Sequence, residues 1–135
     1  MRIKILSFIT YNNTFLLLKN NPDPVHGFSR WFTVTGSVEA GETLEVAVAR
    51  EIKEETNLDI IKIIPLNTFS EYYSNFDKKD CKEHNFISIV KNNQVTLDNI
   101  EVIDYKWVPI DEYITQIWWN EDKNKLKKDL LAKIF

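Results

Sequence analysis

The chain is poor in several features, and each shortage excludes a class of protein. It contains one cysteine, Cys81, so no disulfide can form within it, and a reduced, cytoplasmic protein is expected. No apolar run approaches the roughly 18 residues that a membrane-spanning helix needs, so no membrane association is expected. Positive charge is not in excess either. The chain has 17 basic and 20 acidic residues, and the net charge of -3 argues against a broad grip on a nucleic-acid polymer. The first ten residues alternate like a strand and lack a small-residue cleavage site, so no signal peptide is expected.

The composition is that of an ordinary folded domain. The 135 residues fit one domain, which we expect to cover 1–135, and are enough for a hydrophobic core. Hydrophobic residues make up 44% and charged residues 27% of the chain, and there is no repeat or linker. A small polyphosphate substrate is compatible with the negative net charge, because a bound cation can reverse the local sign.

Hydrophobic patterning predicts an α+β fold with helices packed on a mixed sheet. Alternation and β-rich composition predict strands at 1–10, 14–19, 31–35, 58–69, 85–91 and 102–108. Turn-forming residues predict a hairpin turn at 11–13, loops at 20–30 and 36–41, and an interruption after the last strand at 109–111. Helices are predicted at 44–56 and 120–135, the second with an apolar face made of Leu126, Leu130, Leu131 and Ile134.

The first predicted helix has a signal at each end. Thr43 can cap its N-terminus by accepting a hydrogen bond from a free amide. Asn57 stands where a left-handed residue would end it, and asparagine tolerates that conformation. Between the two ends, Val48, Ala49 and Ile52 form an apolar stripe that is expected to face the core.

Three glutamates lie together beside that stripe. Glu51, Glu54 and Glu55 stand at i, i+3 and i+4, where side chains meet and like charges repel. They also lie in the C-terminal half of the helix, where the macrodipole disfavours anions. A locally unfavourable arrangement of this kind often marks a functional site. A divalent cation would remove the repulsion, and oxygen ligands suit Mg²⁺ or Mn²⁺. Taken alone, the three carboxylates could also form a solvated acidic face.

The spacing around these glutamates resembles that of the Nudix family. The pattern Gly-x5-Glu-x7-Arg-Glu-apolar-x-Glu-Glu-x-Gly-apolar is met at Gly36, Glu42, Arg50, Glu51, Ile52, Glu54, Glu55 and Leu58. The one departure is Asn57, where the family usually has glycine. The resemblance implies the Nudix fold, a mixed sheet sandwiched between helices, and a metal-dependent hydrolase that cuts a pyrophosphate bond. It also implies that no covalent nucleophile is needed, so Cys81 is expected to be structural.

The resemblance assigns roles to individual residues. It implies that Glu51, Glu54 and Glu55 hold Mg²⁺ or Mn²⁺, and that Arg50 pairs with Glu42 to orient the cluster. The base that deprotonates the attacking water would be Glu51 or a glutamate on a later loop.

Two residues are candidates for the later glutamate. Glu101, just before the last predicted strand, is the better candidate and would join the metal ligands. Glu83 is a weaker rival.

The residues around the motif favour a substrate without fixing it. Thr35-Gly36-Ser37, Glu83-His84, and Trp107-Val108-Pro109 followed by Trp118, Trp119 and Asn120 are similar to the subgroup that hydrolyses dihydroneopterin triphosphate and dATP. Arg30 could contact a phosphate, Trp31 could stack on a base or pterin, and His84 is a further candidate for substrate binding. The favoured reaction is cleavage between the α and β phosphates with release of pyrophosphate.

Other functions stay open at this stage. They include an 8-oxo-dGTP-type sanitiser, a dinucleoside polyphosphate or ADP-ribose hydrolase, and a catalytically silent nucleotide-binding regulator. An isoprenoid diphosphate isomerase would need a catalytic cysteine, and Cys81 lies far after the motif in a short chain. The sequence does not fix the oligomeric state, so a homodimer is left open.

Overall fold

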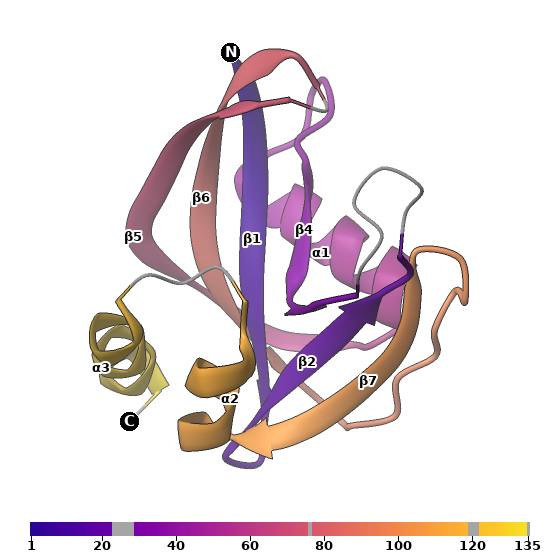
Figure 1. Cartoon of the computed structure of the whole chain (residues 1–135), viewed down its shortest axis with the longest axis vertical. Coiled ribbons are helices and arrows are strands. Elements are labelled where there is room, and N and C mark those ends of the chain that lie inside the picture. Colours follow the sequence, from indigo (N-terminus) through magenta and orange to yellow (C-terminus); the bar gives the residue numbers. More distant parts are fainter. Residues whose placement is uncertain (23–28, 76, 119–121, 135) are drawn as a thin grey trace.

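One mixed sheet with helices on both faces forms the molecule (Figure 1). The computed structural model describes residues 1–22, 29–75, 77–118 and 122–134. In these ranges the elements are, in chain order, β1 (Arg2–Tyr11), β2 (Thr14–Asn20), β3 (Trp31–Phe32), β4 (Val34–Ser37), α1 (Leu44–Thr56), β5 (Ile60–Ser74), β6 (Lys79–Val90), β7 (Val102–Pro109), α2 (Ile110–Gln116) and α3 (Lys123–Ile134). None of the helices in the described ranges is long and apolar enough to cross a membrane.

Strand β1 organises the sheet. It runs parallel to β6 along almost its whole length, while its other edge changes partner from β4 in the N-terminal half to β2 in the C-terminal half. The β1–β2 turn is formed by Asn12 and Asn13, whose φ values of 51° and 63° suit a two-residue hairpin of the I′ type. Beyond these pairs, β5 lies beside β6, and β3 and β7 lie beside β2.

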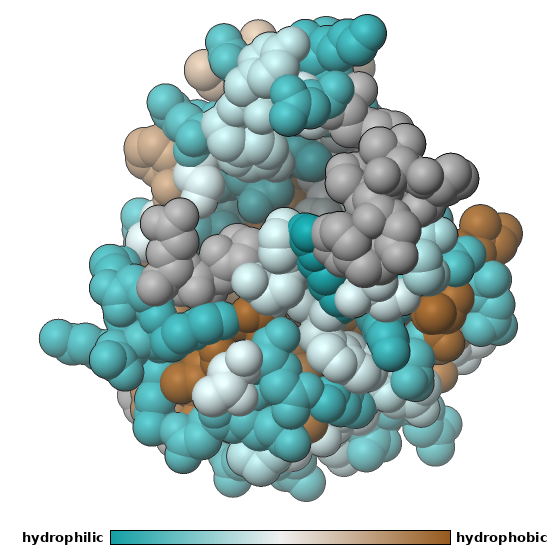
Figure 2. All heavy atoms as spheres, viewed as in Figure 1, coloured by the Kyte–Doolittle hydropathy of each residue, from teal (hydrophilic) through white to brown (hydrophobic). Residues whose placement is uncertain are grey.

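The strands bury apolar side chains on both faces of the sheet. The first core cluster, which includes Ile5, Ile9 and Val34, packs against Val48 and Ile52 of α1. The second cluster lies on the opposite face, where Leu6, Phe8 and Leu17 pack with Tyr113 of α2 and with Leu126 and Leu130 of α3. The sheet is therefore sandwiched between α1 on one side and α2 and α3 on the other, which confirms the expected α+β fold. On the face drawn in Figure 2 most of the surface is hydrophilic, and apolar atoms gather beside α2 and α3.

Several predicted bounds need correction. The run expected at 31–35 is two short strands, because Thr33 between them is buried and donates its hydroxyl to the Ser7 carbonyl at 2.5 Å. Gly36 and Ser37, expected in a loop, belong to β4 and pair with β1. The β5–β6 hairpin is longer than predicted, since its polar outer part is held by strand pairing rather than by burial. Part of the predicted loop at 20–30 lies outside the described residues.

The helices also differ from the prediction in places. Helix α2 was not expected, although Pro109 before it and Asp111 and Glu112 in its first turn are typical of a helix start. Helix α3 is described from Lys123, while 119–121 of the predicted helix lie outside the described residues. In α1 the core residue is Ala47 rather than Ala49, which is exposed.

Candidate active site

Helix α1 carries the predicted acidic cluster and has the predicted bounds and caps. The Thr43 side chain accepts a hydrogen bond from the Val46 amide at 3.2 Å. Asn57 is left-handed, with φ 58°, and its amide donates to the Lys53 carbonyl. Both ends of the helix are therefore fixed by local hydrogen bonds, which determines the direction in which the three glutamates point.

The approach of β4 to α1 fixes Glu51. A Cβ atom placed on Gly36 would lie 2.2 Å from Cδ and 2.4 Å from Oε1 of Glu51, which is far inside van der Waals contact. Only glycine leaves room for the Glu51 carboxylate at this position of β4. Glycine is needed here for the close approach, since Gly36 is not among the positive-φ glycines.

Arg50 connects the cluster to the loop before α1. Its Nε and Nη2 donate to the two Glu42 oxygens at 2.7 and 2.9 Å, and Nη2 also donates to the Ser37 carbonyl at 2.9 Å. Its Nη1 donates to Glu51 at 2.8 Å and to Glu54 at 3.5 Å. All five N–H bonds of the guanidinium are thus used. The bond from Arg50 lowers the pKa of Glu42 to about 2.

The three helix glutamates differ in their surroundings. Glu54 is exposed, while Glu51 is half-buried and bonded to Arg50. Burial raises the pKa of Glu51, against the effect of the Arg50 hydrogen bond. Burial also raises the pKa of Glu55, to about 9, and the charges of Glu51 and Glu101 act in the same direction. The Glu55 Oε2 atom is buried and has no hydrogen-bond partner among the described residues.

The side chains do not form a closed metal site in this conformation. Among the residues that the structure describes, no three acidic, histidine or cysteine side chains converge in metal-binding geometry. Arg50 explains this arrangement, because its Nη1 group donates to both Glu51 and Glu54 and its positive charge compensates their negative charges. Glu55 receives none of these bonds. The donor set and the unpartnered buried oxygen of Glu55 therefore fit a cation.

A loop before β7 faces this cluster. Asp98 Oδ1 accepts hydrogen bonds from the amides of Ile100, Glu101 and Val102, at 2.9, 3.2 and 3.2 Å, which closes the loop into a tight turn. The negative charges of Glu101 and Asp98 both raise the pKa of Glu55, so both residues lie near the helix glutamates. The structure thus brings Glu101 toward the helix glutamates, and it adds Asp98, which the sequence pattern did not single out.

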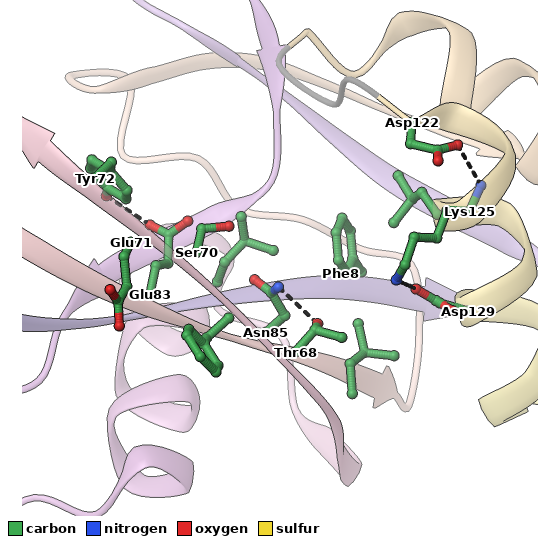
Figure 3. A pocket seen from close by; sticks show the side chains of 14 residues that line it. Phe8, Thr68, Ser70, Glu71, Tyr72, Glu83, Asn85, Asp122, Lys125 and Asp129 are labelled. Atoms are coloured by element: carbon green, nitrogen blue, oxygen red, sulfur yellow. Dashed lines mark hydrogen bonds and ion pairs between the residues drawn. The ribbon is translucent and has the colours of Figure 1, made fainter.

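Glu83 lies apart from the cluster. It stands on β6 and, with Leu6 and Phe8, lines a cavity on the sheet face opposite α1 (Figure 3). Its charge does not contribute to the raised pKa of Glu51 or of Glu55. Glu83 therefore does not replace Glu101 beside the helix glutamates.

The predicted substrate-binding residues are only partly brought together. Arg30 stacks on the Trp118 ring at 3.6 Å, and the Trp118 amide donates to the Trp31 carbonyl at 3.2 Å. His84 lies in β6, separated from β3 and Trp31 by β2 and β1, and packs near Phe69 instead, so the structure does not join it to this group. The predicted Trp119 and Asn120 lie outside the described residues.

Two lysines lie over the Trp31 ring. Lys106 Nζ is 4.5 Å and Lys19 Nζ 5.6 Å from its centroid. Both come from the paired strands β2 and β7, a neighbourhood that sequence patterning could not show. Together with Arg30, these cations make the surroundings of Trp31 positive, in contrast to the acidic cluster on α1.

Comparison with known proteins finds similarity to one protein family along almost the whole chain. The family model described as NUDIX domain matches residues 2–130. The chain is 25% identical over 134 residues to Nudix hydrolase 5 of Arabidopsis thaliana, covering 98% of this chain and 44% of that protein. It is 46% identical over 46 residues to the dihydroneopterin triphosphate diphosphatase of Escherichia coli K12, covering 34% of this chain and 28% of that protein. The chain spans less than half the length of the Arabidopsis protein, and the match to the E. coli protein is confined to a 46-residue stretch.

Solved structures share the fold. The structure of the E. coli dihydroneopterin triphosphate pyrophosphohydrolase superposes with a TM-score of 0.74 at 23% identity, covering 96% of this chain and 95% of that chain. A NUDIX hydrolase from Nitrosomonas europaea also has a TM-score of 0.74, at 18% identity, covering 97% of this chain and 88% of that chain. At these identities the superpositions establish the architecture alone.

Proposed function

Since the chain belongs to the Nudix family, we propose that it hydrolyses a pyrophosphate bond in a nucleoside triphosphate-like substrate with the help of Mg²⁺ or Mn²⁺. The observation that carries this proposal is the buried Glu55 oxygen without a hydrogen-bond partner, beside Glu51 and Glu54 on the same helix. A buried, unsatisfied acceptor costs about 1–3 kcal/mol. A bound cation would remove this cost, because it would coordinate the unpartnered oxygen.

The cation would be held by Glu51, Glu54 and Glu55 of α1, with Glu101 contributing from the loop that faces them. Oxygen-only ligands of this kind match hard divalent ions. When bound, the ion supplies positive charge that neutralises phosphate oxygens and makes nearby water more acidic. Arg50 would then keep Glu42 and the Ser37 carbonyl as its partners, since these three bonds do not involve the helix glutamates.

The other steps belong to side chains of the chain itself. Glu51 is held in one place by Gly36 on one side and Arg50 on the other, so it can accept the proton of an attacking water in a fixed geometry. Glu101 is the alternative base, because it approaches the cluster from a different element. Arg30, with Lys19 and Lys106 close to Trp31, would attract the phosphates toward the carboxylate cluster.

We favour dihydroneopterin triphosphate and dATP as substrates, cut between the α and β phosphates. Thr35-Gly36-Ser37 supports this choice, as does the local likeness to the E. coli diphosphatase named above. The cytoplasmic location stays a prediction, and the oligomeric state stays open.

The test is a kinetic panel with phosphorus NMR of the products. Dihydroneopterin triphosphate, dATP, 8-oxo-dGTP, a diadenosine polyphosphate and ADP-ribose are incubated with Mg²⁺, and Glu51→Gln is compared with Glu45→Gln, an exposed glutamate of the same helix. We expect pyrophosphate from the first two substrates, loss of turnover in Glu51→Gln, and normal turnover in Glu45→Gln. A hundredfold preference for 8-oxo-dGTP, or release of monophosphate, would contradict the substrate assignment. Absence of any turnover would favour a silent nucleotide-binding protein.

A further inference from the structure

The connection between β6 and β7, residues 91–101, lies against the C-terminal end of α1 (Figure 1). It contains no helix or strand. The Thr96 amide donates a hydrogen bond to the carbonyl of Thr56, the last residue of α1, at 3.0 Å. Leu97 packs against the first core cluster, and Val102, just after the connection, is buried in that cluster. The connection is therefore fixed beside the end of the helix that carries the acidic cluster.

Asp98 shapes the last part of this connection. Its Oδ1 accepts hydrogen bonds from three successive amides, those of Ile100, Glu101 and Val102, at 2.9, 3.2 and 3.2 Å. Asn99 is left-handed, with φ 60°, a conformation in which successive amides can converge on one oxygen. These three bonds leave the backbone around Glu101 little freedom, although the connection has no regular structure.

Asn21, directly after β2, binds the same turn through its carbonyl groups. Its backbone amide donates to the Glu101 carbonyl at 2.9 Å, and its side-chain Nδ2 donates to the Ile100 carbonyl at 3.1 Å. The strand pairing between β2 and β7 begins next to these contacts. The turn is thus bonded through its amides to Asp98 and through its carbonyls to Asn21.

This anchoring determines where the Glu101 carboxylate can reach. The Glu101 side chain is exposed and makes no hydrogen bond or ion pair with the residues that the structure describes, so only its backbone fixes its position. Its negative charge nevertheless raises the pKa of both Glu51 and Glu55, which places it within electrostatic reach of the cluster. Groups that orient a metal ligand typically matter tenfold to a hundredfold for metal affinity.

We propose that Asp98 and Asn21 are positioning residues, which hold the backbone of Glu101 so that its carboxylate joins the three α1 glutamates around a divalent cation. The inference rests on the proposed function and adds two residues from outside the helix motif. In this role Asp98 acts as a hydrogen-bond acceptor, and its charge is not required. A side-chain amide oxygen can accept the same bonds, so Asp98→Asn should preserve the turn, whereas Asp98→Ala should not.

The first test is Mn²⁺ binding without nucleotide, measured by electron paramagnetic resonance of the free ion. Glu101→Gln and Asp98→Ala should each weaken Mn²⁺ binding about tenfold, and Asp98→Asn should stay within about twofold of the unmodified protein. Asn92→Ala is the matched control, because Asn92 Oδ1 accepts from the Gln94 amide at 3.0 Å, at the other end of the same connection. It should leave Mn²⁺ binding unchanged.

The possible results separate the inference from the proposed function. If Asp98→Asn binds Mn²⁺ as weakly as Asp98→Ala, the charge of Asp98 or its direct coordination of the ion is responsible, and the positioning role is overturned. Equal weakening in Asn92→Ala would reduce the effect to a general loosening of the connection and overturn it as well. Normal binding in both Glu101→Gln and Asp98→Ala would overturn the inference and leave the α1 glutamates as the site. Absence of Mn²⁺ binding in the unmodified protein would contradict the proposed function instead.

A double-mutant cycle separates positioning from a contribution to folding alone. In the Glu101→Gln background, adding Asp98→Ala should change Mn²⁺ affinity by less than about twofold, because the charged ligand to be positioned is gone. Additive losses would overturn the inference. Asn21→Ala, which removes one of the two Asn21 bonds, should weaken Mn²⁺ binding about threefold. If Asp98→Ala does not fold, Asn21→Ala decides, and an affinity equal to that of Asn92→Ala would overturn the inference.

Discussion

Replacing Gly36 by alanine would separate the folding of this chain from its proposed catalysis. The new Cβ would lie 2.2 Å from the Glu51 Cδ atom, so the carboxylate must retreat by roughly 1 Å to reach normal contact. The obstacle is the end of a flexible side chain rather than backbone, and Gly36 is not left-handed, so the strand itself accepts alanine. Alanine in a strand also gains about 0.5–1 kcal/mol over glycine, which offsets part of the strain.

The expected magnitudes differ between stability and rate. The free energy of unfolding should change by no more than about 1 kcal/mol. Glu51, however, must leave its 2.8 Å contact with Arg50, and a displacement of about 1 Å at a reacting group can lower kcat about a hundredfold. Gly41→Ala is the matched control, because Gly41 has φ 84° and open space around its Cα. It should lose about 1–2 kcal/mol of stability through left-handed strain while keeping most of its activity.

The assay combines urea unfolding in EDTA with pyrophosphate release in Mg²⁺ for the two variants. The expected pattern is crossed, with Gly36→Ala stable but inactive and Gly41→Ala less stable but active. Normal kcat in Gly36→Ala would show that the position of the Glu51 carboxylate does not matter for turnover, and the proposed role of Glu51 would then be wrong.

Four further outcomes are expected. Pyrophosphate release should require Mg²⁺ or Mn²⁺ and stop in EDTA, and full turnover in excess chelator would contradict the cation proposal. Glu54→Gln should lower kcat at least about a hundredfold without loss of melting temperature, because one like-charge pair is removed; a near-normal kcat would make Glu54 a solvated surface residue. Asn57→Gly should be neutral in urea unfolding, whereas Asn57→Val should cost about 1 kcal/mol or more, since φ is 58° there. In EDTA, folded Glu55 keeps a proton that the unfolded chain releases, so its contribution to stability should fall as pH rises from 4.5 toward about 9, and Glu55→Gln should remove this slope.

Local chemistry made α1 predictable from the sequence. Its bounds follow from Thr43, which caps the first turn, and from Asn57, which accepts a left-handed conformation. The Arg50–Glu42 pair was implied by the resemblance of the motif, and both ends of that contact lie on or just before one helix. Features that depend on neighbouring residues in the sequence could thus be predicted from it.

Features that depend on contacts between residues distant in the sequence could not be predicted from it. His84 and Glu83 are adjacent in the sequence, but a strand turns them to opposite faces of the sheet, and only the position of β5 and α3 shows which face has a cavity. Lys19 and Lys106 meet over Trp31 because β2 pairs with β7, a register that no single segment encodes. Helix α2 is short and follows a strand without a loop, so its periodicity covers too few residues to be detected.

The three glutamates of α1 are equivalent in the motif and unequal in the structure, and this inequality is the strongest physical argument for a cation. Arg50 uses all five of its N–H bonds, and none of them reaches Glu55. The buried Glu55 oxygen therefore cannot be satisfied by rearranging the arginine without breaking one of the contacts that it already makes. Protonation relieves the charge but leaves the oxygen unpartnered, at a cost of about 1–3 kcal/mol. A divalent ion would meet both needs at once, because it compensates the charges of the cluster and accepts the lone pair of that oxygen.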